Sequence, residues 1–149
     1  MKFPIHNNLI IELHVPNLDV VKSFYSKLGF VVSLDDKLTA KELGYVTMTR
    51  NDALGSTMLN FYGGDERVYH QSYFKQFPQE TKRGYATEVT ITVGNIEELY
   101  QVACTHLKDH VVRELKELQD HGHSWKDFRM VDPFGFYLRF TELLDWGQK

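Results

Sequence analysis

The sequence predicts an α+β protein made of two copies of one module, each with a strand, a helix and three further strands. An alternating segment, Glu12–Val15, leads into a helix-forming stretch, and a similar segment that ends at Val93 stands seventy-eight positions later. Two turn motifs, Asp52–Gly55 and Asp132–Gly135, are eighty positions apart, and each precedes an apolar strand. Self-similarity at a fixed offset indicates a duplicated structural unit.

In the first copy, apolar and polar residues alternate from Leu9 to Val15, which predicts a strand. Asn17 is expected to cap a helix whose apolar residues recur at helical spacing, and Gly29 is expected to end it. Three strands should follow, at 30–34, 43–50 and 57–62, with a hairpin between the last two.

The second copy repeats this order after a connector with no clear periodicity. Its first strand is expected from Tyr85 to Val93, and Asn95 with Glu98 should form a capping box at the start of its helix. The remaining strands are expected at 111–118, 125–131 and 136–143.

The composition is that of an ordinary globular protein. The chain has 149 residues and a net charge of −3, so we expect one domain, with modules at about 1–63 and 85–149 and a connector at about 64–84. No basic stripe indicates a nucleic-acid partner, and no apolar run reaches the roughly 20 residues of a membrane helix. With one cysteine, Cys104, and no secretory signal pattern, a reducing cytoplasm is the expected location.

Two segments, ELHVPNLDVVKSFYSKLGF and DPFGFYLRFTE, resemble the opening and closing signatures of the vicinal oxygen chelate superfamily. This family includes glyoxalase I, extradiol dioxygenases and the fosfomycin- and bleomycin-resistance proteins. The resemblance covers nearly the whole chain and implies two βαβββ modules whose curved mixed sheets enclose a cavity. A fold alone does not determine a function, which depends on the residues of the site.

In the metal enzymes of this family, each module supplies one ligand from its first strand and one from its last. These positions fall here on Ile10, Asn60 (or its neighbour Leu59), Glu88 and Arg139. Isoleucine has no atom that can bind a metal, and arginine is a permanent cation that repels one. Only one carboxylate and one amide remain, and these are too few to replace the three or four carboxylate or imidazole ligands of a metal site. We therefore expect no metal and no other cofactor, and we expect Glu88 and Arg139 to form an ion pair.

Alternation also predicts which side chains face the cavity, because neighbours along a strand point to opposite faces. The apolar residues would pack against the helices. The cavity side would carry Glu12, His14, Asn60, Tyr62, Glu88, Thr90, Thr92, Tyr137 and Arg139. Such a face is typical of a small-molecule site, although a vestigial face filled by water or neighbouring side chains is the alternative.

Several single residues have two possible roles each, one functional and one structural. His14 could act as a general base or merely line the pocket, and Trp125 could stack on a ligand or pack in the core. His121 and His123, with His110, could bind a transition metal or be exposed turn residues. Cys104 is expected to be inert, since nothing nearby in sequence would lower its pKa.

The segment SWKDFRMVDPFGFYLRF resembles the bleomycin-resistance branch, which has the fold without a catalytic metal. Here the spacing from tryptophan to phenylalanine is one residue shorter, and Phe136 replaces the usual asparagine. The resemblance implies antibiotic resistance or another binding role, so we expect metal-free sequestration of a small aromatic or cationic compound.

Two other functions stay open. One is a lyase, an isomerase or a dioxygenase-like enzyme that uses Glu12, His14 or Glu88, and the other is a dimeric structural or regulatory module. A homodimer is expected in any case, because family members often build their clefts across two chains and the connector at 68–78 is rich in aromatic residues.

Overall fold

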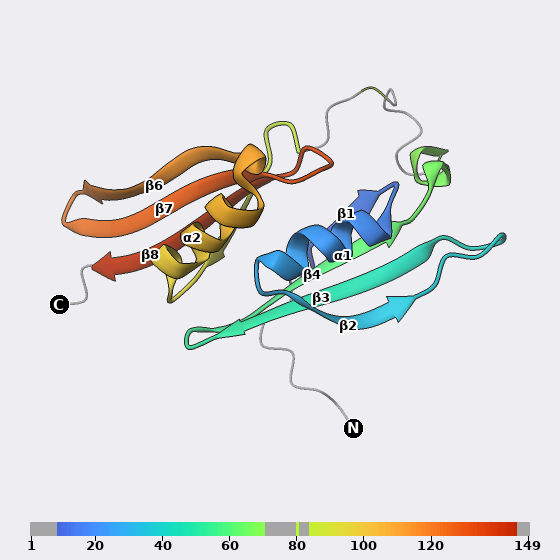
Figure 1. Ribbon diagram of the computed structural model, residues 1–149, viewed down its shortest axis with the longest axis horizontal. Coiled ribbons are helices and arrows are strands. Elements are labelled where there is room, and N and C mark those ends of the chain that lie inside the picture. The colour runs from blue at the N-terminus through green and yellow to red at the C-terminus, as the bar shows by residue number, and fades with distance from the viewer. Residues whose placement is uncertain (1–8, 71–79, 81–83, 146–149) are drawn as a thin grey trace.

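The computed structural model describes residues 9–70, 80 and 84–145, and these form two four-stranded mixed sheets with one long helix on each (Figure 1). The predicted α+β class and the duplicated strand–helix–three-strand order are confirmed. Among the described residues, no helix has the length and the apolar character needed to cross a membrane.

The first sheet has the strand order β1-β4-β3-β2, with β1 parallel to β4 and the other pairs antiparallel. Its elements are β1 (Glu12–Val15), α1 (Leu18–Lys27), β2 (Val31–Asp36), β3 (Gly44–Asp52) and β4 (Gly55–Gly63), followed by the short 3-10 helix η1 (Glu66–His70). The predicted start of β1 at Leu9 is wrong, because pairing to β4 begins only where the amide of Asn60 donates to the carbonyl of Ile11.

The second sheet repeats this topology with the order β5-β8-β7-β6. Its elements are β5 (Glu88–Thr92), α2 (Ile96–His106), η2 (Lys108–His110), β6 (Val111–Asp120), β7 (His123–Val131) and β8 (Tyr137–Asp145). The strands β6 and β7 extend further into their hairpin than predicted, so that only a tight turn at His121 and Gly122 separates them.

The two helices start in different ways. Asn17 caps α1 as predicted, because its Oδ1 accepts from the amide of Val20 at 3.0 Å. The predicted capping box of α2 is wrong: Asn95 makes no side-chain cap, and its Oδ1 instead accepts from the guanidinium of Arg50 at 3.0 Å. The carboxylate of Glu142, on β8, takes over the cap by accepting from the amide of Ile96 at 3.0 Å.

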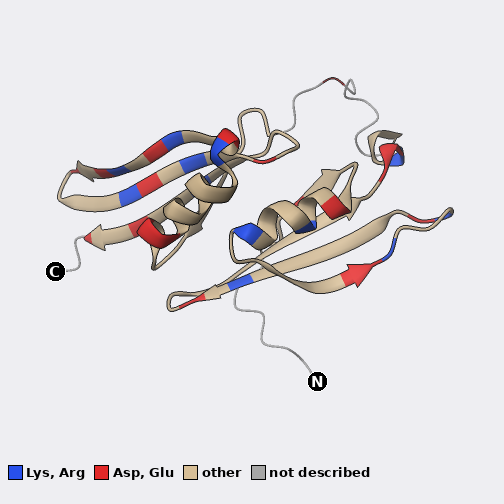
Figure 2. Ribbon diagram, in the orientation of Figure 1, with Lys and Arg blue, Asp and Glu red and all other residues tan. Residues whose placement is uncertain are grey.

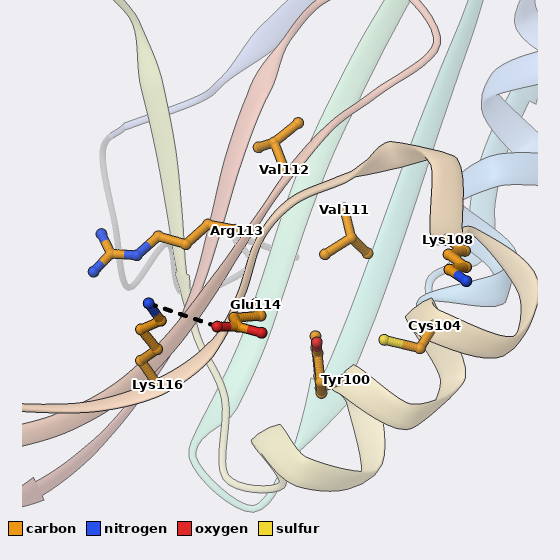
Figure 3. Close-up of a pocket in the computed structure, with 8 residues that line it drawn as sticks. All are labelled: Tyr100, Cys104, Lys108, Val111, Val112, Arg113, Glu114 and Lys116. Carbon is orange, nitrogen blue, oxygen red and sulfur yellow. Dashed lines mark ion pairs between the residues drawn. The ribbon is translucent and has the colours of Figure 1, made fainter.

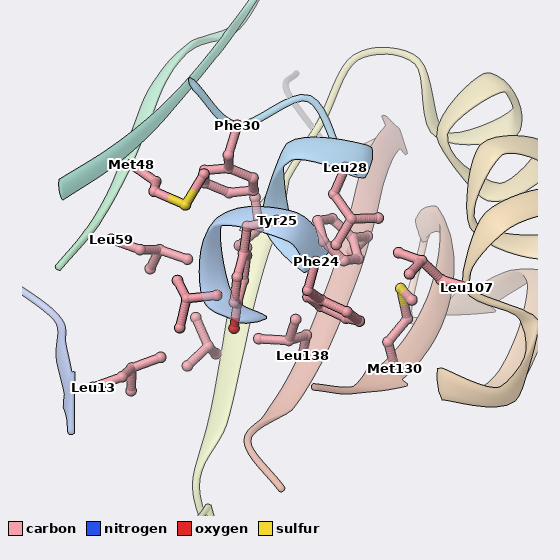
Figure 4. Close-up of a cluster of buried hydrophobic side chains, with 14 of the residues drawn as sticks. Leu13, Phe24, Tyr25, Leu28, Phe30, Met48, Leu59, Leu107, Met130 and Leu138 are labelled. Carbon is pink, nitrogen blue, oxygen red and sulfur yellow. The ribbon is translucent and has the colours of Figure 1, made fainter. Parts of the chain in front are cut away.

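One cluster of buried apolar side chains includes residues of both modules. Figure 4 shows Phe24 and Tyr25 of α1 between apolar side chains of the first sheet, such as Leu59, and those of the second, such as Met130. The modules therefore pack through α1 and their apolar faces, and burial of this shared surface stabilises their contact.

The expected cavity is not enclosed within this chain, and that part of the prediction is wrong. Each helix covers the apolar face of its own sheet, and the sheets do not close around the opposite faces (Figure 1). Because the modules contact each other through their helical sides, their polar faces stay open: Glu12, Glu88, Thr90 and Thr92 are all exposed. We call these the first and the second open face, after the sheet that carries them.

Candidate functional site

The first open face carries a cluster of aromatic rings beside a carboxylate. Nε2 of His14 lies 2.8 Å from Oε1 of Glu12, and the His14 ring meets the ring of Tyr62 edge-on at 5.0 Å between centroids. The ring of Tyr45 lies 6.5 Å from that of Tyr62. Burial raises the pKa of Tyr45, and the charge of Glu12 adds to this effect. Glu12, His14 and Tyr62 are thus brought together as the alternation predicted.

Asn60, also predicted for this face, lies next to the cluster but is largely buried. The hydroxyl of Thr47 donates to its Oδ1 at 3.0 Å across the β3–β4 pair. This bond fixes the amide beside Glu12, which is paired with Asn60 in the β1–β4 register. Asn60 therefore helps to shape the face and presents little surface to a ligand.

The other end of the first open face is apolar and exposed. Val31 of β2, Thr49 of β3 and Met58 of β4 form one cross-strand row, and the side chains of Val31 and Met58 are 69% and 59% exposed. Leu34 lies nearby on β2 and is also exposed. Several exposed apolar side chains on one sheet face are typical of an interaction surface.

The second open face is charged. Figure 2 shows basic and acidic segments in close succession along β6 and β7, whereas β3 and β4 are mostly uncharged. Arg113, Arg129 and Arg139 are direct neighbours in the register from β6 through β7 to β8. Like charges opposite each other on adjacent strands oppose sheet pairing, so this row needs compensating charges.

Asp127 supplies the main compensating charge. Its side chain is fully buried, and its Oδ2 accepts from Nε of Arg139 at 3.0 Å and lies 2.8 Å from Nη2 of the same residue. The indole N–H of Trp125 also donates to this oxygen, at 3.3 Å. The predicted pair of Glu88 and Arg139 is confirmed as an ion pair at 3.7 Å, but it is longer than the contact with Asp127.

Arg129 is held more loosely than Arg139. Its guanidinium lies 3.6 Å from Glu88 and 4.0 Å from Asp127, and its centre is 6.0 Å from the Tyr137 ring. A hydrogen bond with Tyr137 raises the pKa of Arg129, so the guanidinium stays charged. Its Nε is buried without a hydrogen-bond partner among the described residues.

The histidines outside the open faces are not brought together. His121 is exposed in the β6–β7 turn next to Asp120, and His123 begins β7. His110 lies beside the other end of β7, where its Nδ1 meets the carbonyl of Val131 at 2.9 Å and its ring packs on Phe24. Within the part of the chain that the structure describes, no group of three or more potential metal-binding side chains is found.

The metal positions of the resembling family do not fit a metal in this chain. Ile10 precedes β1, its side chain is 71% exposed, and it offers no donor atom. Arg139 places a permanent cation beside Glu88, and Asn60 already bonds to Thr47. A divalent ion would meet a fixed positive charge and too few oxygen or nitrogen ligands.

A shallow pocket of about 480 Å³ lies on the other side of the second sheet, between α2 and β6 (Figure 3). Cys104 lines it and accepts a hydrogen bond from Tyr100, which raises the pKa of the Tyr100 hydroxyl. In Figure 3 the side chain of Arg113 points away from α2. The pocket is lined by apolar, aromatic and charged side chains together: Tyr100, Cys104, Lys108, Val111, Val112, Arg113, Glu114 and Lys116.

Four residues of the open faces were not predicted from the sequence: Tyr45, Arg113, Asp127 and Arg129. The signal for three of them is present in the sequence. Tyr45 alternates with the buried Val46 and Met48, and Asp127 and Arg129 flank the buried Phe128. Arg113 could not be placed in this way, because register shifts occur on both sides of it in β6.

No protein-family model and no curated protein matches the sequence. Solved structures do match over nearly their whole length. TioX from Micromonospora sp. ML1 is 15% identical, with a TM-score of 0.63, and the match covers 93% of this chain and 99% of that one. A glyoxalase family protein from Enterococcus faecalis is 21% identical, with a TM-score of 0.56 and coverage of 92% and 98%.

A glyoxalase/bleomycin resistance protein/dioxygenase from Alicyclobacillus acidocaldarius is 20% identical, with a TM-score of 0.55 and coverage of 95% and 96%. At such low identity these matches establish the fold and leave the function to the residues of the site. The resemblance predicted from the two signature segments is confirmed at the level of the fold.

Proposed function

Because this chain has the fold of the glyoxalase/bleomycin resistance/dioxygenase proteins, we propose that it binds a small aromatic compound with a positive group and releases it unchanged. The observation that carries the proposal is the cluster of Glu12, His14, Tyr45 and Tyr62 on the first open face. Rings beside a carboxylate suit a cationic aromatic molecule, because the rings offer stacking and cation–π contacts and the carboxylate offers the opposite charge.

We also propose that the chain works as a homodimer. An open sheet face gives a ligand contact on one side only, whereas small-molecule sites bury most of the ligand surface. The exposed apolar side chains of Val31 and Met58 lie at the other end of the same open face and provide a surface that a second copy can cover. The connector residues 71–79, which entered the sequence argument for a dimer, lie outside the described residues.

A second candidate function is acid–base catalysis. The 2.8 Å contact between Glu12 and His14 favours it, since a carboxylate that orients an imidazole is a common arrangement for proton transfer. Glu88 fits this function less well, because its carboxylate already has Arg129 and Arg139 as ion-pair partners. The reaction class would be a lyase or an isomerase that needs no metal.

Calorimetric titration with benzylamine and its uncharged analogue benzyl alcohol tests the binding proposal. We expect benzylamine to bind more tightly, and we expect Glu12→Gln to remove that preference. Glu114→Gln is the matched control, since Glu114 is an exposed carboxylate on β6, away from the cluster. Equal binding of the two compounds, or an unchanged preference in Glu12→Gln, would contradict the proposed ligand class.

Incubation with molecules extracted from cells separates binding from turnover. Sequestration predicts that mass spectrometry recovers every bound compound with its mass unchanged and in a fixed ratio to protein. Catalysis predicts a product that accumulates beyond that ratio and that His14→Ala abolishes.

A further inference from the structure

The row of Arg113, Arg129 and Arg139 is the feature of the second open face that the proposed function leaves unexplained. The three residues are register partners across β6, β7 and β8. Two carboxylates, Asp127 and Glu88, lie among them. Among the described residues Arg113 has no ion-pair partner, so three cations face two anions at this position.

The two carboxylates play different roles. Asp127 is buried and bonds to Arg139 at 2.8 and 3.0 Å, which fixes the orientation of that guanidinium. Glu88 lies 3.6 Å from Arg129 and 3.7 Å from Arg139, beyond the length of a charge-assisted hydrogen bond. The Nη1 atoms of Arg129 and Arg139 therefore both face Glu88, but neither forms a short hydrogen bond with it.

We propose that this row binds the carboxylate of an aromatic organic acid. The planar guanidinium fork matches a carboxylate in geometry as well as in charge. Tyr137 lies under Arg129, and Trp125 stands beside Asp127 on the same face, so rings for stacking are close to the cations. The inference rests on the proposed function only in that the chain binds small molecules, and it goes beyond it by assigning an acidic ligand class to the second open face.

Glu88 acts as an internal competitor in this arrangement. A carboxylate that enters between Arg129 and Arg139 takes over the two contacts that Glu88 makes at long range. Removal of the Glu88 charge should therefore strengthen acid binding, which a purely structural network of charges does not predict. The direction in which Glu88→Gln changes the affinity for an acid therefore distinguishes an acid-binding site from a purely structural network of charges.

Three substitutions test the role of the arginine row, and each is chosen from the contacts described above. Arg129→Met removes one cation and leaves the bond between Asp127 and Arg139 in place, so the fold should survive. Glu88→Gln removes the competitor and keeps the shape of the side chain. Lys27→Met is the control for overall charge, because Lys27 is exposed at the end of α1, away from the second open face.

The experiment is calorimetric titration of the full chain and of each variant with benzoate, benzyl alcohol and benzylamine, after thermal melts have shown that the variants are folded. We expect benzoate to bind more tightly than benzyl alcohol. Arg129→Met should weaken benzoate binding by about tenfold or more, from the loss of a charge-assisted hydrogen bond. Glu88→Gln should strengthen it, and Lys27→Met should leave it unchanged.

The outcomes separate this inference from the proposed function. Glu12→Gln should weaken only benzylamine, and Arg129→Met should weaken only benzoate. Loss of benzylamine binding with normal benzoate binding would refute the cationic ligand class and support the arginine row. Benzoate that binds no better than benzyl alcohol, or that binds more weakly to Glu88→Gln than to the unmodified chain, would overturn the inference even if benzylamine binds as proposed.

Discussion

The hydroxyl of Tyr25 donates a hydrogen bond of 2.9 Å to Oδ2 of Asp132, across 107 positions of the sequence. Tyr25 is fully buried on α1, and Asp132 lies in the turn between β7 and β8. The other carboxylate oxygen accepts from the amides of Phe134 and Phe136, so this one side chain shapes the turn and also joins the two modules.

Replacement of Tyr25 by phenylalanine should destabilise the protein with little change in shape. The change keeps the ring and removes the hydroxyl, which leaves a buried oxygen of Asp132 without its partner. We expect a loss of about 1–3 kcal/mol in the free energy of unfolding, measured by urea denaturation. Tyr85→Phe is the control, because Tyr85 is 83% exposed. Equal stability of Tyr25→Phe and the unmodified chain would show that the bond contributes nothing.

The same pair predicts how stability depends on pH. Burial raises the pKa of Asp132 above 3.8, although its hydrogen bonds oppose the shift. The folded state therefore binds this proton more tightly than the unfolded state. The contribution to stability is fully present below the unfolded pKa and is lost as pH rises through the folded pKa.

Asp132→Asn should remove this dependence, because an amide keeps the size of the side chain but does not titrate. The free energy of unfolding of the unmodified chain, minus that of Asp132→Asn, should fall as the pH rises above about 4, the usual pKa of an aspartate. Denaturant titrations at several pH values measure the difference. A difference that rises over this range would mean that the pKa of Asp132 is lowered in the folded state.

Arg50 forms a second connection between the modules. Its buried guanidinium bonds to the carbonyl of Leu28, to Asp52 at 2.7 Å and to Asn95 at 3.0 Å. Burial by itself would raise the pKa of Asp52, but the bonds from Arg50, Leu54 and Gly94 lower it. Loss of the guanidinium would leave this charge partly buried without its cation.

Arg50→Met should therefore cost about 3–5 kcal/mol of unfolding free energy, as is typical when one partner of a buried ion pair is removed. The double variant Arg50→Met/Asp52→Asn should recover part of the loss, because it no longer buries an unpaired charge. Denaturation of both single variants and the double variant measures the coupling. Strictly additive effects would show that the two side chains stabilise the fold independently.

The sequence was sufficient for features that depend on local pattern. The order of elements and the shared face of Glu12, His14 and Tyr62 follow from periodicities of 2 and 3.6 residues, and the cap at Asn17 follows from the capping preference of asparagine. The role of Asn95 was mispredicted because a buried arginine from the other module competes for its side chain. No local pattern reveals such a contact.

The openness of the two polar faces could not be predicted for a related reason. Alternation shows which residues share a face, but not what that face meets once the modules pack. The modules here meet through α1 and their apolar faces, as the contact of Tyr25 with Asp132 shows, so the polar faces point away from the shared core. Of the three arginines in the row, only Arg113 was hidden, because bulges in β6 break the register on which a face assignment depends.

The proposed dimer makes the last prediction. If a second copy covers the apolar end of the first open face, sedimentation at micromolar concentration should give twice the chain mass of 17.4 kDa. Met58→Lys places a charge at the β4 end of the exposed row that Val31 and Met58 share. It should shift the population towards the monomer, because burial of an unpaired charge opposes association.

Val112→Lys is the control for this variant. Val112 is 53% exposed, similar to Met58, but it lies on β6 of the second sheet. Both variants should unfold near the urea concentration of the unmodified chain, since neither residue belongs to the buried cluster. A monomer for the unmodified chain would refute the dimer, and a dimer that Val112→Lys disrupts while Met58→Lys does not would place its interface on the second sheet.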